Sequence, residues 1–460
     1  MKVLDLKEDI KSSVVVFLVA LPLCLGIALA SNAPLASGLI AGIIGGILVG
    51  FFSDSQISVS GPAAGLTVIV ANGITQLGGF EMFGLALIVA GLFQIIFGLI
   101  KGGAIGDYFP TAVIKGMLAA IGLILIIKQF PNAFSQQSMG LNIISAVSIT
   151  IMLSWEKLAN KGLDFFKLIP GALVAVIVSV ILNQTFHLVG EDFLVRMPSD
   201  IFSKMQMPNF SGLTFGVFSV AFTIAIVASL ETLLCIDASD KIDPMKRKTS
   251  KNRELLAQGV GNSLSGFFGG LPVTAVIVRT SANVNAGAKS KMSAVFHGVW
   301  LVACVLLIPG VLNLIPLATL ACVLLLTGYK LTKPAFFVDM KKRGWDQLFI
   351  FCVTISGILA TDLLKGIFIG LGFAILFELR SPSISSIEIE EDGNKVHVKF
   401  IKNVSFFQKA KIHKLLHDIP RSKEVHIHGT KIVRLHVDVR ELLADFHNEG
   451  IKDGMEIKFI

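Results

Sequence analysis

The chain has 460 residues, of which 53% are hydrophobic and only 16% are charged, and its mean hydropathy is +0.75. A soluble globular protein carries about 25% charged residues, so the composition excludes a wholly soluble protein and indicates an integral membrane protein. The net charge of +8 falls mainly in connections between apolar segments. This distribution is typical of cytoplasmic loops, so we expect membrane lipid and no nucleic acid among the partners.

Apolar runs of spanning or near-spanning length recur from the N-terminus to residue 380. They begin near Ser12, Pro34, Gly61, Phe80, Pro110, Asn142, Leu168, Leu213, Glu254, Pro272, Ser293, Asn313, Trp345 and Leu363. We therefore predict an α-helical polytopic membrane protein with about 14 transmembrane segments. The five cysteines (Cys24, Cys235, Cys304, Cys322, Cys352) lie in apolar stretches without pairing or metal-ligand spacing, and we expect buried thiols.

The third and tenth runs are short and begin with Gly-Pro and Gly-Gly-Leu-Pro, respectively. If the fourteen runs are divided into two sets of seven, each of these two is the third in its set. Short, interrupted segments at matching positions predict 7+7 inverted repeats with two half-helices. Basic residues cluster in the connection over residues 241–253, after the eighth run. The positive-inside rule then places both termini in the cytoplasm, and we expect the bacterial inner membrane as the location.

The last 80 residues differ from the rest, because they hold 25 of the 72 charged residues and seven of the nine histidines. We predict a transmembrane domain over residues 1–380 and a small cytoplasmic α/β domain over residues 381–460. Its expected strands are Ile384–Ile389, Lys395–Ile401, Glu424–His428 and Met455–Ile460, and its expected helices are Gln408–Ile419 and Arg440–His447.

The two predicted half-helices form a candidate anion site. Residues 59–67 and 270–275 would each present a helix N-terminus lined with small residues, where free N–H groups and the helix dipole attract an anion. The hydroxyls of Ser60, Thr67 and Thr274 and the backbone near Ala63, Val273 and Ala275 suit an oxyanion. The alternative is that these Gly and Pro residues only kink packed helices. Two such segments at matched positions favour the binding site.

Two charged residues lie within apolar runs. Arg279 follows the second half-helix start, and we expect it to add positive potential to the site. Glu231, with Thr232 and Cys235 on the same run, is the candidate cation-coupling residue, because a carboxylate in such surroundings needs a proton, a cation or a partner. A structural Glu231–Arg279 ion pair is the alternative.

No nucleotide loop, nucleophile elbow or zinc motif is present, so we predict neither an enzyme nor a cofactor beyond a coupling Na⁺ or H⁺. In the tail, His413 and His417 are four residues apart, and His426 and His428 alternate on a predicted strand. Either pair could bind a metal, but no third ligand is specified. A solvated polar face is the favoured interpretation, and no metal site is predicted.

Four stretches together resemble the SulP family of inorganic anion transporters, the sulfate-permease and bicarbonate-carrier group. They are Ser58–Pro62 (SVSGP), Leu230–Leu234 (LETLL), Gly261–Pro272 and, most specifically, Arg279–Gly287 (RTSANVNAG). The resemblance covers the whole membrane domain. It implies core and gate domains, a substrate site between the third and tenth helices, elevator-like alternating access and a homodimer.

Carried over to this chain, the resemblance implies that Thr67, the Val273–Ala275 backbone and Arg279 face the anion and that Glu231 occupies the acidic coupling position. The first helix departs from the family's Pro-Gln-Gly signature, since it reads Pro22-Leu23-Cys24. Cys235 stands where sodium-coupled members have a hydroxyl, which favours proton coupling because thiols are poor ligands for hard cations. The tail resembles a short STAS domain without its usual Asp-Ser loop.

The leading hypothesis is thus secondary transport of a small inorganic anion. A nucleobase permease of the same architecture is one alternative, against which Arg279 and residues 283–287 argue. An anion channel or an anion-sensing regulator acting through the tail is the other.

Overall fold

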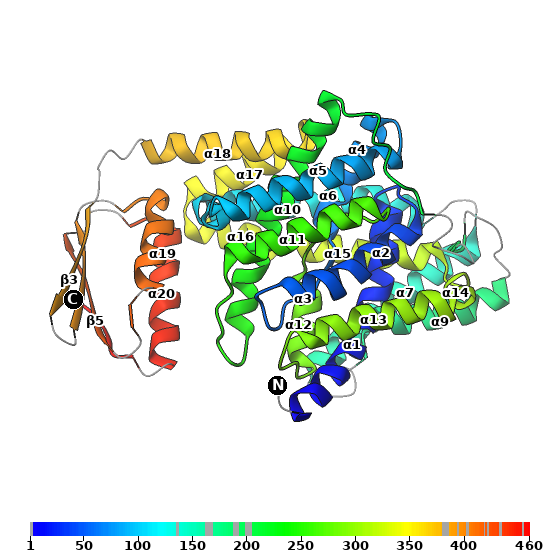
Figure 1. Cartoon of the computed structure of the whole chain (residues 1–460), viewed down its shortest axis with the longest axis horizontal. Helices are drawn as coiled ribbons and strands as arrows, with labels where there is room; N and C mark the ends of the chain where they lie inside the picture. Colours follow the sequence, from blue (N-terminus) through cyan, green and yellow to red (C-terminus); the bar gives the residue numbers. More distant parts are fainter. Residues whose placement is uncertain are drawn as a thin grey trace. The chain divides into compact units, whose positions relative to one another are not determined.

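The structure is a computed structural model, and it describes residues 3–134, 138–161, 169–186, 193–197, 205–379, 386–392, 395–401, 404–417, 419–420, 423–431, 435–452 and 455–460. It divides into two compact units. The first comprises Met1–Gly103 and Ile121–Thr332, and the second comprises Ala104–Ala120 and Lys333–Ile460. Helices make up most of the described residues before residue 380, and a small sheet with two helices follows (Figure 1).

Each of the fourteen predicted apolar runs contains a helix. These helices are α1 (Val3–Ala30), α2 (Leu35–Ile44), α4 (Thr67–Leu77), α5 (Phe80–Leu99), α6 (Thr111–Ala133), α7 (Met139–Asn160), α9 (Gly171–Phe186), α10 (Phe215–Ile242), α11 (Lys251–Phe267), α12 (Ile277–Asn285), α13 (Met292–Leu307), α15 (Leu317–Leu331), α17 (Trp345–Ala360) and α18 (Leu363–Leu379). Within the described residues, seven helices are long and apolar enough to cross a membrane. The count of fourteen spans stays a prediction.

Shorter helical pieces complete these units. The π-helical turn η1 (Gly45–Val49) and α3 (Gly50–Phe52) extend α2, and α14 (Pro309–Leu312) and α16 (Pro334–Arg343) flank α15. The 3₁₀ turns η2 (Ala64–Leu66) and η3 (Gly102–Tyr108) precede α4 and α6.

Helices α5 and α11 pack closely because both present glycines at their contact. A Cβ added to Gly259 would lie 2.7 Å from the carbonyl oxygen of Gly91, and one added to Gly266 would lie 2.6 Å from that of Gly84. Small residues let the backbones of membrane helices approach in this way. The close approach holds the polar face of α11, described below, against the rest of the first unit.

Two short strands precede the half-helices. Strand β1 (Ser60–Pro62) pairs with β2 (Val273–Ala275) in antiparallel register, with Ser60 opposite Ala275 and Pro62 opposite Val273. Proline cannot donate a ladder hydrogen bond and disfavours helix at the residue before it, which is consistent with extended backbone around Pro62. Residues 60–62 and 273–275 are therefore strands, whereas the sequence predicted the first turns of two helices.

The tail forms a four-stranded sheet with two helices, close to the predicted elements. Its strands lie in the order β3 (Ser386–Asp392), β4 (Lys395–Ile401), β5 (Glu424–Lys431) and β6 (Ile457–Phe459). The first pair is antiparallel and the other two pairs are parallel. Helices α19 (Lys409–His417) and α20 (Val437–Lys452) make the two crossovers and lie together on one side of the sheet (Figure 1).

Alternation along the central strands gives this sheet two different faces. Val396, Val398 and Phe400 on β4 and Val425 and Ile427 on β5 are buried in the core with apolar residues of α19 and α20. Successive side chains of a strand point to opposite faces, so His397, Lys399, His426 and His428 lie on the face away from the helices. The tail sheet thus has an apolar face, covered by α19 and α20, and a polar face on its other side.

The tail contacts helices of the second unit. Arg343 at the end of α16 makes a two-pronged ion pair with Glu441 of α20, with N–O distances of 2.8 and 2.9 Å. The backbone N–H of Thr111 donates to the Asp438 carboxylate at 2.9 Å, which adds a contact at the start of α6. The tail is therefore joined to these helices by polar contacts. An independent domain over residues 381–460, and its assignment as STAS-like, stay predictions.

Candidate functional site

The β1–β2 pair brings the starts of the two half-helices together. Strand β1 leads through η2 into α4, and β2 leads through Val276 into α12. Because the strands are paired, the N-terminal ends of α4 and α12 both lie next to the same two-stranded ladder. The positive ends of two helix dipoles therefore act on one small region. This is the arrangement that the Gly/Pro breaks in the third and tenth runs predicted.

The structure gathers the predicted substrate-binding residues around this ladder. All of them are buried: Ser60, Ala63, Thr67, Val273, Thr274, Ala275 and Arg279. Their hydroxyls differ in what they offer a ligand. The Thr67 hydroxyl donates to the carbonyl of Ala64 at 2.8 Å and that of Thr274 to the carbonyl of Ala275 at 3.3 Å, whereas Ser60 Oγ accepts from Gln258 at 2.8 Å. Of the three, Ser60 retains its O–H as a donor.

Arg279 is the third residue of α12, and its side chain is fully buried. Its Nη2 lies 3.4 Å from the carbonyl oxygen of Pro62 and 3.4 Å from Sγ of Cys24. In the part of the chain that the structure describes, Nε and Nη1 have no hydrogen-bond partner. A buried donor without a partner costs about 1–3 kcal/mol, and more when the group is charged. The guanidinium therefore has donors ready for an anion.

Glycine at position 61 makes room for this guanidinium. A Cβ built on Gly61 would lie 2.9 Å from Cζ of Arg279 and closer still to Nη1. Any larger residue would have to displace the arginine. The Ser58–Pro62 motif therefore has a steric role, because it lets the first ladder strand lie directly against the charged side chain.

A polar face of α11 holds both strands of the ladder. Glu254, Gln258 and Asn262 are four residues apart, so they lie on one face of the helix, and all three are fully buried. Gln258 Nε2 donates to Ser60 Oγ at 2.8 Å and to Glu254 at 3.0 Å. The Asn262 amide accepts the N–H of Val273 at 2.6 Å and donates to its carbonyl at 2.9 Å. One helix face thereby positions both half-helix starts.

Glu231 lies on α10 beside the first half-helix. A Cβ on Gly65 would lie 2.7 Å from Oε2 of Glu231, so the carboxylate is close to the chain just before α4. Oε2 has no hydrogen-bond partner among the described residues. The structural alternative, an ion pair between Glu231 and Arg279, is not formed. Oε2 of Glu231 and Nε and Nη1 of Arg279 all lack a hydrogen-bond partner among the described residues.

The other two predicted coupling residues have neighbours of their own. Thr232 Oγ1 accepts the backbone N–H of Ala275 at 3.4 Å, which links α10 to β2. The Cys235 thiol lies 3.9 Å from the hydroxyl of Ser239. The three side chains therefore share a helix, but their hydrogen bonds do not converge on one point.

Sequence reasoning missed several residues of this site. Gln258 and Asn262 are side-chain amides four residues apart, in the predicted run that begins near Glu254. His297 of α13 is fully buried, and neither ring nitrogen has a partner within the described residues. Cys24, which the sequence indicated only as a buried thiol and as a departure from a family signature, is a neighbour of Arg279. The spacing of the amides was the available signal, whereas the contacts of Cys24 depend on tertiary structure.

Comparisons with known proteins agree with this architecture. The bicarbonate transporter BicA of Synechocystis sp. is 28% identical over 423 residues, which cover 84% of this chain and 73% of that protein. The solved transmembrane domain of a cyanobacterial BicA has a TM-score of 0.68 at 23% identity, covering 81% of this chain and 99% of its own. The murine anion transporter Slc26a9 has a TM-score of 0.70 at 16% identity, covering 98% and 85%.

The sequence profile of the Sulfate permease family matches residues 6–143 and 139–354, which is well over half of the chain. The family's members are transporters of inorganic anions, so the predicted integral membrane transporter, as opposed to an enzyme, is confirmed. The chain belongs to the sulfate permease family.

Proposed function

We propose that the protein is a secondary carrier that moves a small inorganic oxyanion, of the sulfate or bicarbonate class, by elevator-like alternating access in a homodimer. The observation that carries the proposal is the state of Arg279, a fully buried cation with Nε and Nη1 unpartnered at the ladder where two half-helices begin. A buried charge without a partner is unstable unless a ligand completes its hydrogen bonds. An oxyanion has the charge and the acceptor atoms to do so.

The surroundings of Arg279 favour a small, highly charged ligand over a nucleobase. The donors near the ladder are a guanidinium, helix N-termini and the Ser60 hydroxyl, and each is suited to oxygen atoms of an anion. A nucleobase would instead require acceptors and donors in a planar pattern. Among the described residues near the ladder, Oε2 of Glu231 and Oε1 of Gln258 are acceptors without a partner, and they lie on different helices, α10 and α11. Two separate acceptor atoms do not make such a pattern.

We propose that Glu231 couples transport to a cation, and that this cation is H⁺. An unpartnered carboxylate in an apolar run needs a proton, a metal ion or an opposite charge. Arg279 does not pair with it. A Na⁺ site would need oxygen ligands, but Thr232 Oγ1 already accepts a backbone N–H and Cys235 offers sulfur. Protonation needs no further ligand.

Uptake into proteoliposomes tests this function. Labelled sulfate and labelled bicarbonate are offered separately, each under an imposed pH gradient and an imposed Na⁺ gradient. We expect saturable uptake of one of the anions that the pH gradient accelerates. Uptake that does not saturate would indicate a channel. If neither anion moves under any gradient, the proposed substrate class is wrong.

A further inference from the structure

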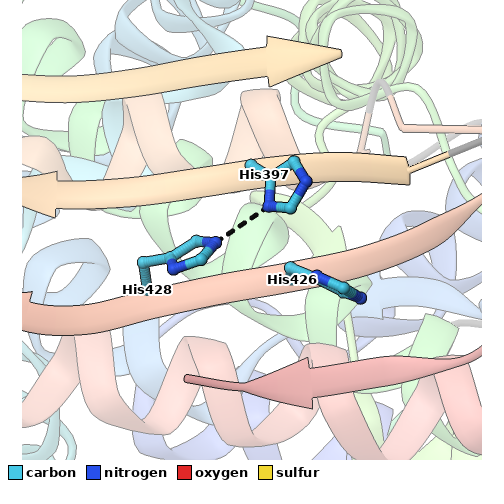
Figure 2. A group of neighbouring side chains, drawn as sticks. All are labelled: His397, His426 and His428. Atoms are coloured by element: carbon cyan, nitrogen blue, oxygen red, sulfur yellow. Dashed lines mark hydrogen bonds between the residues drawn. The ribbon is translucent and has the colours of Figure 1, made fainter. Parts of the chain in front are cut away.

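The outer face of the tail sheet carries a cluster of three histidines. His397 lies on β4, and His426 and His428 lie on β5 (Figure 2). Nδ1 of His397 and Nε2 of His428 face each other at 2.9 Å, and one ring nitrogen from each of the three lies within 4.8 Å of the others. His397 and His428 are partly exposed, whereas His426 is only 9% exposed.

The sheet register creates this cluster. In the parallel pair β4–β5, His397 is directly opposite His426, and Lys399 is opposite His428. Residues two apart on a strand point to the same face, so the His-x-His pattern of β5 places both rings beside the ring on β4. The cluster therefore has the third histidine that the spacing of His426 and His428 alone does not specify.

We propose that His397, His426 and His428 form a binding site for a divalent transition-metal ion, with Zn²⁺ as the representative ion. Three imidazoles around one point are a donor set that Zn²⁺, Ni²⁺ and Cu²⁺ prefer, and a water molecule would complete tetrahedral coordination of Zn²⁺. Zn–N bonds of 2.0–2.1 Å place two ligand nitrogens about 3.3 Å apart in a tetrahedron. The 2.9 Å His397–His428 contact needs to open only slightly to reach this spacing.

A carboxylate orients one of the three rings from behind. Glu424 Oε1 lies 2.6 Å from Nε2 of His426, which leaves Nδ1 of that ring as the ligand nitrogen. Metal-binding histidines commonly hold a carboxylate on the other ring nitrogen, which fixes the tautomer and increases the basicity of the ligand. Glu424 also accepts from Lys458 at 2.8 Å, so its own position is fixed.

The charges around the cluster do not oppose a cation. Lys395 and Lys399 flank His397 on the same face of β4. Lys399 is paired with Glu390 at 2.5 Å, and Lys395 lies opposite Glu424 in the strand register. Lys458, opposite His426 on β6, is paired with both Glu424 and Glu456, at 2.8 and 2.7 Å. Lys399 and Lys458 therefore each have an acidic partner.

Zn²⁺ binding to the full-length protein, purified without a polyhistidine tag, tests the site. We expect one Zn²⁺ per chain that His426→Ala removes, and a Co²⁺ absorption spectrum typical of a four-coordinate site. His397→Ala and His428→Gln should weaken Zn²⁺ binding by more than about 100-fold, and Glu424→Gln by about 10- to 100-fold, as for an outer carboxylate. His447→Ala, in which the ring removed is on α20 and lies at a tilt against the ring of Phe459, is the matched control and should bind Zn²⁺ normally.

Two results would overturn the site. One is a wild-type protein that binds no Zn²⁺ in stoichiometric amount. The other is loss of Zn²⁺ in His447→Ala equal to the loss in His426→Ala, which would place the ion elsewhere. Gel filtration of each variant establishes that it is folded, and His428→Gln preserves a hydrogen-bonding side chain on the exposed face. The test is independent of the transported anion, because Zn²⁺ binding is measured without any transport assay.

Discussion

The guanidinium of Arg279 occupies the space that a side chain on Gly61 would need, although the two residues are 218 positions apart in the chain. One belongs to the first strand of the ladder and the other to the half-helix that follows the second strand. The close approach fixes the arginine beside Pro62 and Cys24 with two donor atoms unpartnered. The proposed anion site thus depends on the absence of a single Cβ atom.

Gly61→Ala should therefore abolish most transport while the protein still folds. The new methyl group would overlap the guanidinium and displace it from the ladder. Overpacking typically costs about 1–3 kcal/mol, and if that cost falls on anion binding, affinity decreases about 5- to 150-fold. Uptake in proteoliposomes measures the effect. Gly310→Ala is the control, because a Cβ there meets no atom within 4 Å. Wild-type uptake by Gly61→Ala would contradict the steric role.

Arg279→Lys should raise the KM for the transported anion about 10- to 100-fold. Lysine keeps the positive charge but loses the planar set of N–H donors, and hydrogen bonds to charged groups contribute about 1.5–3 kcal/mol each. The concentration dependence of uptake gives KM. Arg253→Lys, which alters an arginine paired with Asp54 on an exposed surface, should leave KM unchanged. An equal change of KM in both variants would contradict a role for Arg279 in anion binding.

Glu231→Gln should abolish acceleration of uptake by a pH gradient and leave a slower, uncoupled flux. Glutamine has nearly the same shape but does not take up or release a proton. Uptake rates with and without the gradient are compared in the same liposomes. Glu81→Gln, at an exposed position at the start of α5, provides the control. Retention of the full pH response in Glu231→Gln would assign the coupling to another group.

Asp243→Asn should destabilise the protein at neutral pH but not in acid. Burial, the largest single cause, raises the pKa of the Asp243 carboxyl. The hydrogen bonds from Arg247 and from the backbone N–H of Met245, together with the charge of Arg247, outweigh it, so the net pKa lies below its ordinary value. A carboxyl with a depressed pKa contributes stability that is present above the unfolded-state pKa, about 3.9, and is lost as pH falls through the lower folded-state value.

The expected loss at pH 7 is about 1.5–3 kcal/mol, the range for hydrogen bonds to charged groups, because Arg247 contacts both carboxylate oxygens. Thermal unfolding in detergent at a series of pH values measures the difference between variant and wild type. Asp362→Asn is the comparison. The pKa of the Asp362 carboxyl is also lowered, but its side chain is 40% exposed and pairs with an exposed lysine, so its stability difference should be smaller. A difference that does not narrow below about pH 4 would contradict this account.

Much of the secondary structure could be predicted because its causes are local. The apolar runs predict helices, and Pro62 and Pro272 mark the two breaks, since a proline disrupts helix wherever it stands. The alternation and turn residues of the tail predict the order and type of its strands and helices, with ends that differ by up to five residues, as for α20. The two short strands were not predicted, because each is formed only by pairing with a partner more than 200 residues away.

The sequence by itself determined that the chain is a membrane transporter of this family, with two half-helices and an α/β tail, and it identified Arg279 and Glu231 as charged residues within apolar runs. The tertiary structure alone decided which atoms these residues meet. In the folded chain Glu231 and Arg279 form no ion pair, and the side chains of Gln258 and Asn262 on α11 make hydrogen bonds to the two ladder strands. The fold also brings His397 next to the two histidines of β5. The physical reason is that periodicity and backbone propensity act over a few residues. The hydrogen bonds that define a site join residues far apart, and only the folded chain sets those distances.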